Sequence, residues 1–455
     1  YVAGKTLPAW IIAFSANSTG ESAWLLLGLT GMGYVVGVHA LWVVLGEVLG
    51  VALAWSFVAL PFKRYTDRYG SITVTDYLTS RFRDSGHTFR LIGVVIIVSM
   101  VTTYMAAQLT ASGKAFDAFL GTGYTGGVLL GAAVIFYYTT VGGFKAVAYS
   151  DALQGLLMLG GLIVLPVIGV AAAGGWSAMV TALRAADPDL LEPMGTLGLS
   201  IAGVASAVSF AGIGMAFLGA PQLLTRFMAA RSENEIVSGS LIAVVCIIVF
   251  DLGAVLTGMA GRVLVPGLSD PEMVLPILSA DLFPALFTGL FLVVVLAAIM
   301  STADSVLLLA SSAVVRDVVQ PVFRPDLDQR RLALYGKVTT VVIGLVGLGF
   351  ALTETRLIFW FVLFAWSGLA SAFTPVVVCS LFWSGTTRAG AIAGMVSGFL
   401  ATVIWVLVFK SSFYELYEMW PGFLTGFGVT IGVSLMTAPP EGAAEEHQDV
   451  WSFHG

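Results

Sequence analysis

Long apolar runs recur along this sequence from end to end, and they constrain its fold more than any other feature does. A helix needs about 20 apolar residues to cross a bilayer, and a spanning segment must satisfy its own backbone hydrogen bonds. Because 58% of the 455 residues are hydrophobic and 11% are charged, a water-facing surface could not cover them. The sequence therefore predicts an all-α integral membrane protein, multi-pass in the cell membrane and surrounded by the lipid bilayer. The expected spans are residues 7–30, 34–59, 91–119, 125–140, 151–173, 199–218, 236–260, 285–314, 332–352, 358–380, 390–409 and 420–436.

The charged residues predict how the chain is oriented. Most of the 21 Lys and Arg fall in alternate connections between spans, and the positive-inside rule assigns those connections to the cytoplasm. No basic run indicates nucleic-acid binding. We expect one transmembrane domain over residues 1–437 and a cytoplasmic tail over 438–455, whose polar, proline-containing start is typical of disorder. The chain opens on Tyr1 without a start Met, so we expect its natural N-terminus to lie upstream.

A polar run interrupts the first span. Residues 15–24 read Ser-Ala-Asn-Ser-Thr-Gly-Glu-Ser-Ala-Trp, and Ser, Asn, Thr and Gly weaken a helix or compete with its hydrogen bonds. Unwound backbone at membrane depth is tolerated only where it lines a cavity, and a carboxylate such as Glu21 needs a partner, an ion, water or a substrate. We therefore expect a broken helix here, the alternative being a polar seam at which helices pack.

A second interruption falls in the sixth span. Residues 209–221 contain three glycines and a proline, which weaken a helix. Two breaks that each begin a unit of five spans predict inverted core repeats over about 7–173 and 199–380, because an odd number of spans inverts the second copy. The alternative is that these glycines serve close helix packing.

Hydroxyl side chains cluster in the eighth span. Residues 297–305 read Ala-Ala-Ile-Met-Ser-Thr-Ala-Asp-Ser, and helical spacing puts Ala298, Ser301, Thr302 and Ser305 on neighbouring turns of one face. Sodium, as a hard cation, prefers oxygen ligands, which these hydroxyls and the carbonyls of a broken helix would provide. Hydroxyls that bond back to their own helix are the alternative. The intramembrane acid Asp304 favours a functional role.

Several short motifs match one known family of membrane proteins. They are residues 15–22 with Trp24, Tyr104, Gly142 to Phe144, Ser150 and Asp151 with Gln154, Gly219 with Pro221, Arg226 to Ala229, and Ala298 to Thr302. On these motifs the chain resembles the sodium/solute symporter family over nearly its whole length, most closely the sodium/proline symporters. The resemblance implies a LeuT-like fold of two inverted five-helix repeats, with discontinuous first and sixth core helices and additional C-terminal helices.

The resemblance also implies where ions bind. It places one sodium ion on backbone carbonyls of Ser18, Glu21 and Ala298 and on the hydroxyls of Ser301 and Thr302. It places Asp151 at the cytoplasmic ion exit or a second sodium site, with Asp304 and Ser305 facing it. The position of Asp151 after a Gly-Gly pair is equally typical of a helix N-cap.

We expect a sodium-coupled symporter that imports a small organic solute by alternating access, with proline or a related amino acid as the substrate. The chain shows no catalytic constellation, so we do not expect an enzyme. The expected substrate-binding residues, aromatic walls and one acid, are Glu21, Trp24, Tyr104, Phe217 and Trp366. Gly20 stands where the proline-type pattern has Asp, and Ile213 and Phe217 stand where it has Trp and Tyr. A neutral sugar or another small metabolite is therefore the alternative substrate.

Three further polar residues lie at membrane depth, namely His39, Glu47 and Asp251. These residues suggest either that protons take part in the function or that an ion-binding network is present. For His39 and Glu47 we favour the interpretation that they are paired structural groups. An ion channel or a transporter-like sensor would be the alternatives from other functional classes, but no filter motif or attached signalling domain is visible. The sequence leaves the sodium stoichiometry and the oligomeric state open.

Overall fold

The computed structural model of the chain describes residues 4–353 and 358–452, and these residues fold into helices with short connections. The first half contains α1 (Ala9–Ala23), α2 (Thr30–Val36), α3 (Leu41–Leu53), α4 (Ala59–Arg68), α5 (Val74–Arg81), α6 (Thr88–Leu120), α7 (Tyr124–Val141) and α8 (Phe144–Ala172). The second half contains α9 (Trp176–Ala186), α10 (Ile201–Gly212), α11 (Pro221–Met228), α12 (Glu233–Leu264), α13 (Val274–Leu282), α14 (Ala285–Ser312), α15 (Gln329–Ala351), α16 (Ile358–Phe382), α17 (Arg388–Ile404), α18 (Met419–Leu435) and α19 (Ala443–Ser452).

The helices suit a membrane by length and composition. Ten helical stretches among the described residues are long and apolar enough to cross one, and α18 is a shorter apolar helix. The first stretch, Ala9–Arg68, has 60 residues, about three times what one span needs. It turns back at Gly37, whose φ of 55° is a left-handed conformation that glycine adopts without strain. Dividing this stretch at Gly37 and including α18 gives the twelve predicted spans.

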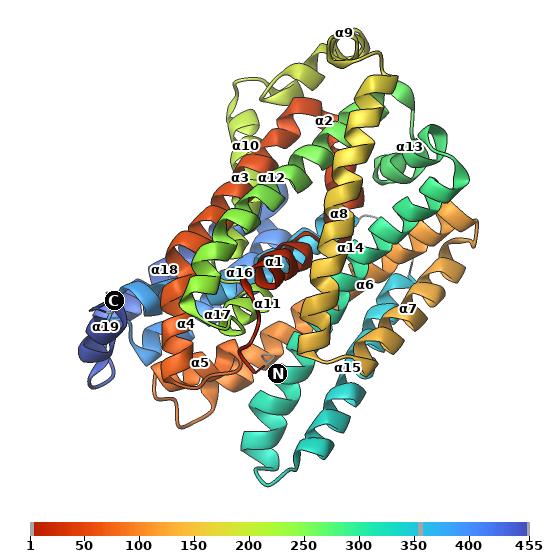
Figure 1. Cartoon of the computed structure of the whole chain (residues 1–455). Coiled ribbons are helices and arrows are strands. Elements are labelled where there is room, and N and C mark those ends of the chain that lie inside the picture. Colours follow the sequence, from red (N-terminus) through yellow and green to blue (C-terminus); the bar gives the residue numbers. More distant parts are fainter. Residues whose placement is uncertain (1–3, 354–357, 453–455) are drawn as a thin grey trace.

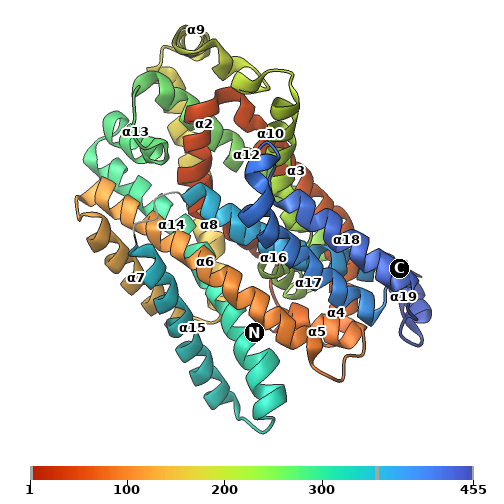
Figure 2. The same ribbon diagram turned by 180° about the vertical axis from the view of Figure 1, so that it is seen from behind.

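The broken helix α1 lies at the centre of the molecule (Figure 1). It packs against α8, α12 and α14, while α16 packs against the broken segment that follows α10. Helices α17 and α18 pack on each other and on α16, and they lie towards the outside (Figure 2). The two broken elements are therefore enclosed by the other core helices.

The start of α1 is joined to the end of α11 by backbone hydrogen bonds. The Leu7 N–H donates to the Ala229 carbonyl at 3.1 Å, and the Arg231 N–H donates to the Leu7 carbonyl at 3.0 Å. The two broken helices thus meet at one end of the molecule.

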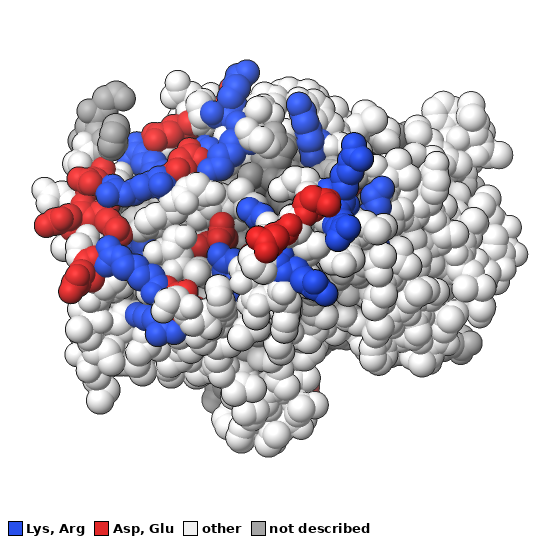
Figure 3. All heavy atoms as spheres, turned by 90° about the horizontal axis from the view of Figure 1, so that it is seen from below, with Lys and Arg blue, Asp and Glu red and all other residues white. Residues whose placement is uncertain are grey.

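Charged side chains gather at the end of the molecule that carries α5 and α19 (Figure 3). This is the end that the positive-inside rule assigns to the cytoplasm.

The expectation of a disordered tail is wrong, because α19 packs on α4. The carboxylate of Asp449 pairs with Arg68 at 3.0 Å, and the Trp451 indole donates to the Leu381 carbonyl at 3.1 Å. These specific partners order a segment whose composition alone is typical of disorder.

Candidate functional site

The first helix breaks inside the polar run that predicted it. Ser22 has φ 55° and ψ −169°, which interrupts α1, and a π-helical segment, Trp24–Leu29, continues the chain towards α2. The Ser22 hydroxyl accepts a hydrogen bond from the Trp24 N–H at 3.1 Å. A polar side chain thus satisfies a backbone group that the break releases.

The sixth span is broken as well. Helix α10 ends at Gly212, a 3₁₀ segment covers Ile213–Leu218, and α11 begins at Pro221. Gly219 lies against Thr374 of α16, so closely that a Cβ would be 2.5 Å from the Thr374 Cα. Both predicted breaks are therefore present, and the glycines of the second break also serve close packing.

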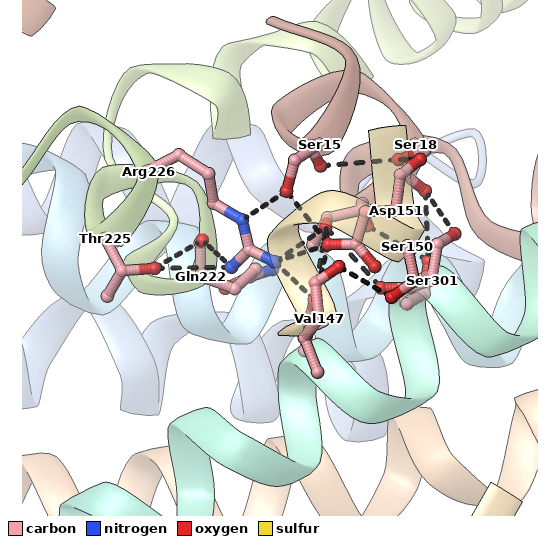
Figure 4. Close-up of polar contacts among 12 residues, drawn as sticks. Ser15, Ser18, Val147, Ser150, Asp151, Gln222, Thr225, Arg226 and Ser301 are labelled. Carbon is pink, nitrogen blue, oxygen red and sulfur yellow. Dashed lines mark hydrogen bonds and ion pairs between the residues drawn. The ribbon is translucent and has the colours of Figure 1, made fainter. Parts of the chain in front are cut away.

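Oxygen atoms of α1 and α14 converge beside the first break. The Ser301 hydroxyl is 3.0 Å from the Ser18 carbonyl oxygen and 3.1 Å from that of Ala298. The Thr302 hydroxyl is 3.4 Å from the Ser18 carbonyl oxygen and 3.1 Å from that of Thr19. All five residues are buried, and Figure 4 shows Ser18 and Ser301 facing each other. Neutral oxygens gathered in this way fit a hard cation such as sodium.

Four of the five predicted sodium ligands, all but Glu21, therefore contribute oxygen atoms that meet. The prediction for Glu21 concerns its backbone carbonyl. The Glu21 carbonyl accepts a hydrogen bond from the Trp24 N–H. The carboxylate of Glu21 lies beside Glu47 of α3 and Asp251 of α12. Sequence reasoning named these three acids separately and did not predict that they meet.

Asp151 lies inside α8 and is not a helix N-cap. The helix begins at Phe144, directly after the Gly-Gly pair, and Gly143 is the cap residue. One carboxylate oxygen of Asp151 accepts hydrogen bonds from Ser15 at 2.9 Å and from Ser305 at 3.3 Å. The predicted contact between Asp151 and Ser305 is thus present.

The same oxygen of Asp151 pairs with Arg226 of α11. Their N–O distance is 3.0 Å, and both side chains are buried. Figure 4 shows the two side chains facing each other. Arg226 also donates to the hydroxyls of Ser15 and Thr19. Sequence reasoning assigned Arg226 to a cytoplasmic connection. The signal that could have found it is the spacing of Gln222, Thr225 and Arg226, which puts the polar residues of Pro221–Met228 on one face of the helix.

Asp304 is fully buried next to Ser305. Neither of its carboxylate oxygens has a hydrogen-bond partner among the described residues. The side chain therefore differs from that of Asp151, which accepts hydrogen bonds from Ser15, Thr19, Ser305 and Arg226.

Aromatic side chains enclose the space between the two breaks. The rings of Phe217 and Trp366 are 5.4 Å apart, edge to face, and the Trp366 indole donates to the Ile213 carbonyl at 3.1 Å. Phe217 also lies against Gly20, where a Cβ would be 2.8 Å from its ring. Phe217 therefore occupies the room that a larger residue at position 20 would need.

The remaining predicted substrate residues are buried nearby. Trp24 stacks on Phe359 with ring centroids 5.8 Å apart, and Phe359 belongs to α16, the helix of Trp366. The Trp24 indole N–H and the Tyr104 hydroxyl have no hydrogen-bond partner among the described residues. Unpartnered buried donors of this kind are suited to a polar ligand.

Two cavities approach this region from different ends of the helices. One of about 230 Å³ is lined by Arg226 and Ser305 and by residues of the α7–α8 turn. The other, of about 380 Å³, is lined by Phe210, Ile213 and Tyr417. The aromatic pair Phe217 and Trp366 lines neither cavity.

His39 is a paired structural group, which is the interpretation that we favoured from the sequence. Its ring nitrogens lie 2.7 Å from the Pro193 carbonyl oxygen and 2.8 Å from the Ser206 hydroxyl. It thereby connects the segment before α3 both to α10, through Ser206, and to the connection before α10, through Pro193. It does not join Glu21, Glu47 and Asp251 in their cluster.

Solved structures share this architecture. A sodium-coupled sialic acid symporter, in a substrate-bound outward-open state, aligns with a TM-score of 0.79 at 17% identity, covering 96% of this chain and 91% of that one. MhsT in complex with L-phenylalanine aligns with a TM-score of 0.57 at 15% identity, covering 94% and 98%. These similarities confirm the LeuT-like fold.

Curated relatives match over nearly the whole sequence. The high-affinity proline transporter PutP of Bacillus subtilis is 34% identical over 99% of this chain and 95% of its own length. A sodium/proline symporter of Staphylococcus aureus is 32% identical over 96% of this chain and 87% of its own length. The family model described as the sodium:solute symporter family matches residues 1–398. This chain belongs to the sodium:solute symporter family, as its first-helix break and Ser-Thr pair led us to expect.

Proposed function

We propose that this protein imports proline, or a closely related small amino acid, by sodium-coupled symport with alternating access. The observation that carries the proposal is the convergence of the Ser301 and Thr302 hydroxyls on carbonyl oxygens of the broken helix α1. Binding of sodium there would link α1 to α14, and this link makes sodium binding a means of changing the conformation.

The proposed sodium ligands are oxygen atoms from two helices. They are the carbonyls of Ser18, Glu21 and Ala298 and the hydroxyls of Ser301 and Thr302. A sodium ion at this position would replace the hydroxyl-to-carbonyl hydrogen bonds with ion–oxygen contacts. Both kinds of oxygen can bind the ion, because hydroxyl and carbonyl oxygens each carry lone pairs.

The proposed exit for the ion runs past Asp151, Asp304 and Ser305. Support comes from the cavity of about 230 Å³, whose lining includes Ser305 and Arg226. Both residues contact the Asp151 carboxylate. An ion that leaves the α1–α14 site on this side would thus pass a buried acid before it reaches the cavity.

The proposed substrate site lies between the two breaks. Trp24, Tyr104, Phe217 and Trp366 form its walls, and Glu21 is the acid proposed to attract the substrate ammonium. At the start of α11, Pro221 has no N–H and the N–H groups of Leu223 and Leu224 bond to the Ala220 carbonyl, which leaves the Gln222 N–H as the donor proposed for the substrate carboxylate. A zwitterion with a compact apolar ring suits the aromatic walls, the acid and this donor, which supports proline.

The proposed moving parts are the two core repeats over about 7–173 and 199–380, within one transmembrane domain that ends near residue 437. The link between Leu7 and the end of α11 supports joint movement of the two broken helices.

Uptake into proteoliposomes tests the proposal. An inward sodium gradient should drive accumulation of radiolabelled proline, and collapse of the gradient should abolish it. Unlabelled amino acids, neutral sugars and carboxylates then compete in turn. Sodium-driven uptake of a neutral sugar that no amino acid inhibits would overturn the assignment of the substrate.

Substitutions test the site itself. Phe217→Ala should raise the KM for proline by about 10-fold, because burying a Phe against a ligand contributes ~1.5 kcal/mol or more. Phe350→Ala, on the exposed surface of α15, is the matched control and should leave the KM unchanged. If the two substitutions change the KM for proline equally, Phe217 is not part of the substrate site.

A further inference from the structure

Three acidic side chains from three different helices meet inside the molecule. Glu21 comes from the break in α1, Glu47 from α3 and Asp251 from α12, and one oxygen from each lies within 4.8 Å of the others. All three residues are buried, with exposed fractions of 0%, 3% and 0%. We call this group the acidic triad.

The acidic triad has no positive partner in the described part of the protein. None of the ion pairs found there includes any of the three residues. Both oxygens of Glu21, both of Asp251 and one of Glu47 are buried and accept no hydrogen bond from described residues. A buried charge is normally paired or bound to a metal ion, so this cluster calls for a bound positive charge.

Three other buried acids of the protein, unlike Asp304, have polar partners among the described residues. Asp317 accepts a hydrogen bond from Thr73 at 2.7 Å and another from Thr75. Glu272 is paired with Lys114, and Glu418 is paired with Lys410 at 2.7 Å. The absence of any such donor among the described residues around the acidic triad therefore sets it apart from these three acids.

The geometry identifies the class of ligand. Carboxylate oxygens are the ligands that hard cations prefer, and three carboxylates offer up to six of them. The Tyr104 hydroxyl, which also lacks a partner among the described residues and is fully buried, belongs to α6, which contacts α1. The triad residues Glu47 and Asp251 lie on α3 and α12, whereas Ser301 and Thr302 lie on α14. The two oxygen clusters therefore share only the helix α1.

We propose that Glu21, Glu47 and Asp251 form a second sodium site, separate from the one between α1 and α14. Sodium is the ion that this family uses to drive transport, so it is present at high concentration on the side from which transport starts. Binding there would join α3 and α12 to the break in α1, while binding at the first site joins α14 to the same helix. Two sodium ions would then fix α1 from two sides.

Equilibrium binding of ²²Na⁺ to the purified full-length protein in nanodiscs tests this inference. The wild-type protein should bind two sodium ions. Glu47→Gln and Asp251→Asn, tested separately because one of them could impair folding, should each bind one. The matched control Asp317→Asn removes a buried acid that has hydroxyl donors, and it should still bind two. In uptake assays the Hill coefficient for sodium should fall from about two to about one in the triad variants.

A further variant separates this inference from the proposed function, with which it shares the use of sodium and the residue Glu21. The double variant Ser301→Ala with Thr302→Ala should keep one ion, bound at the acidic triad. If that variant still binds two ions, the α1–α14 site is wrong while the triad is unaffected. A wild-type stoichiometry of one, or of two in both Glu47→Gln and Asp251→Asn, would overturn the second site. Tight calcium binding at the triad that sodium does not displace would overturn the choice of ion.

Discussion

At the scale of single residues, the hydroxyls of Ser301 and Thr302 carry the most specific prediction. Ser301→Ala or Thr302→Ala should raise the sodium concentration for half-maximal proline uptake by about 5- to 150-fold. This range corresponds to the ~1–3 kcal/mol that one oxygen contact with a charged group contributes. The measurement is the initial uptake rate in proteoliposomes as a function of sodium concentration.

Ser312→Ala is the matched control for this prediction. Ser312 lies on the same helix α14, and its hydroxyl bonds to the Leu309 carbonyl of that helix, at 2.9 Å. Its removal should leave the sodium dependence unchanged. The α1–α14 site is refuted if Ser301→Ala and Thr302→Ala behave like Ser312→Ala.

At the scale of elements, the second break depends on glycines that let α3 touch it. A Cβ on Gly50 of α3 would collide with the Gly214 carbonyl oxygen, and one on Gly214 would collide with that of Gly46. Gly50→Ala should therefore push α3 away from the 3₁₀ segment Ile213–Leu218 and destabilise the fold by about 1–3 kcal/mol. We expect a lower Tm in detergent and slower uptake.

The control for Gly50→Ala is a glycine in open surroundings. Gly428 lies in α18, and a Cβ added there would meet no atom within 4 Å. Gly428→Ala should raise the Tm slightly, because alanine is the better helix former. A Tm for Gly50→Ala equal to that of the wild-type protein would show that the two elements are not in tight contact.

At the scale of the whole molecule, the Asp151–Arg226 pair lies between the α1–α14 site and the cavity next to the α7–α8 turn. Asp151→Asn should slow proline uptake by about 10-fold or more, a barrier increase of ~1.4 kcal/mol, because it removes the acid on the proposed exit path of the ion. The KM for proline should change little, since Asp151 is not one of the proposed substrate residues. A raised KM with an unchanged maximal rate would contradict this role.

Removal of both partners is the test of the pair. Asp151→Asn leaves Arg226 as an unpaired buried charge, which typically costs ~3–5 kcal/mol of stability. The double variant with Arg226→Gln should regain part of the lost Tm, so the two effects should not add. Additive losses of Tm would indicate that the two side chains do not depend on each other.

The sequence predicted the spans, both breaks and the Ser-Thr cluster because polar residues are anomalous at membrane depth. It misplaced Arg226, since charge counting assigns a basic residue to a connection and cannot see that α11 buries it against α8. It could not bring Glu47 and Asp251 together, because they lie far apart in the chain and only the packing of α3 and α12 decides their distance. It also missed α19, whose order comes from arginine partners on α4 and not from its own composition.

The short backbone pairing of Leu7 with Ala229 and Arg231 has a consequence for energy coupling. Main-chain hydrogen bonds do not depend on side-chain identity, so this joint withstands most substitutions. Through it, a rotation of one broken helix would displace the other in the same step. The proposed sodium site beside the first break and the proposed substrate site between the breaks would then belong to one mechanical unit, which could not expose them to the two sides of the membrane independently.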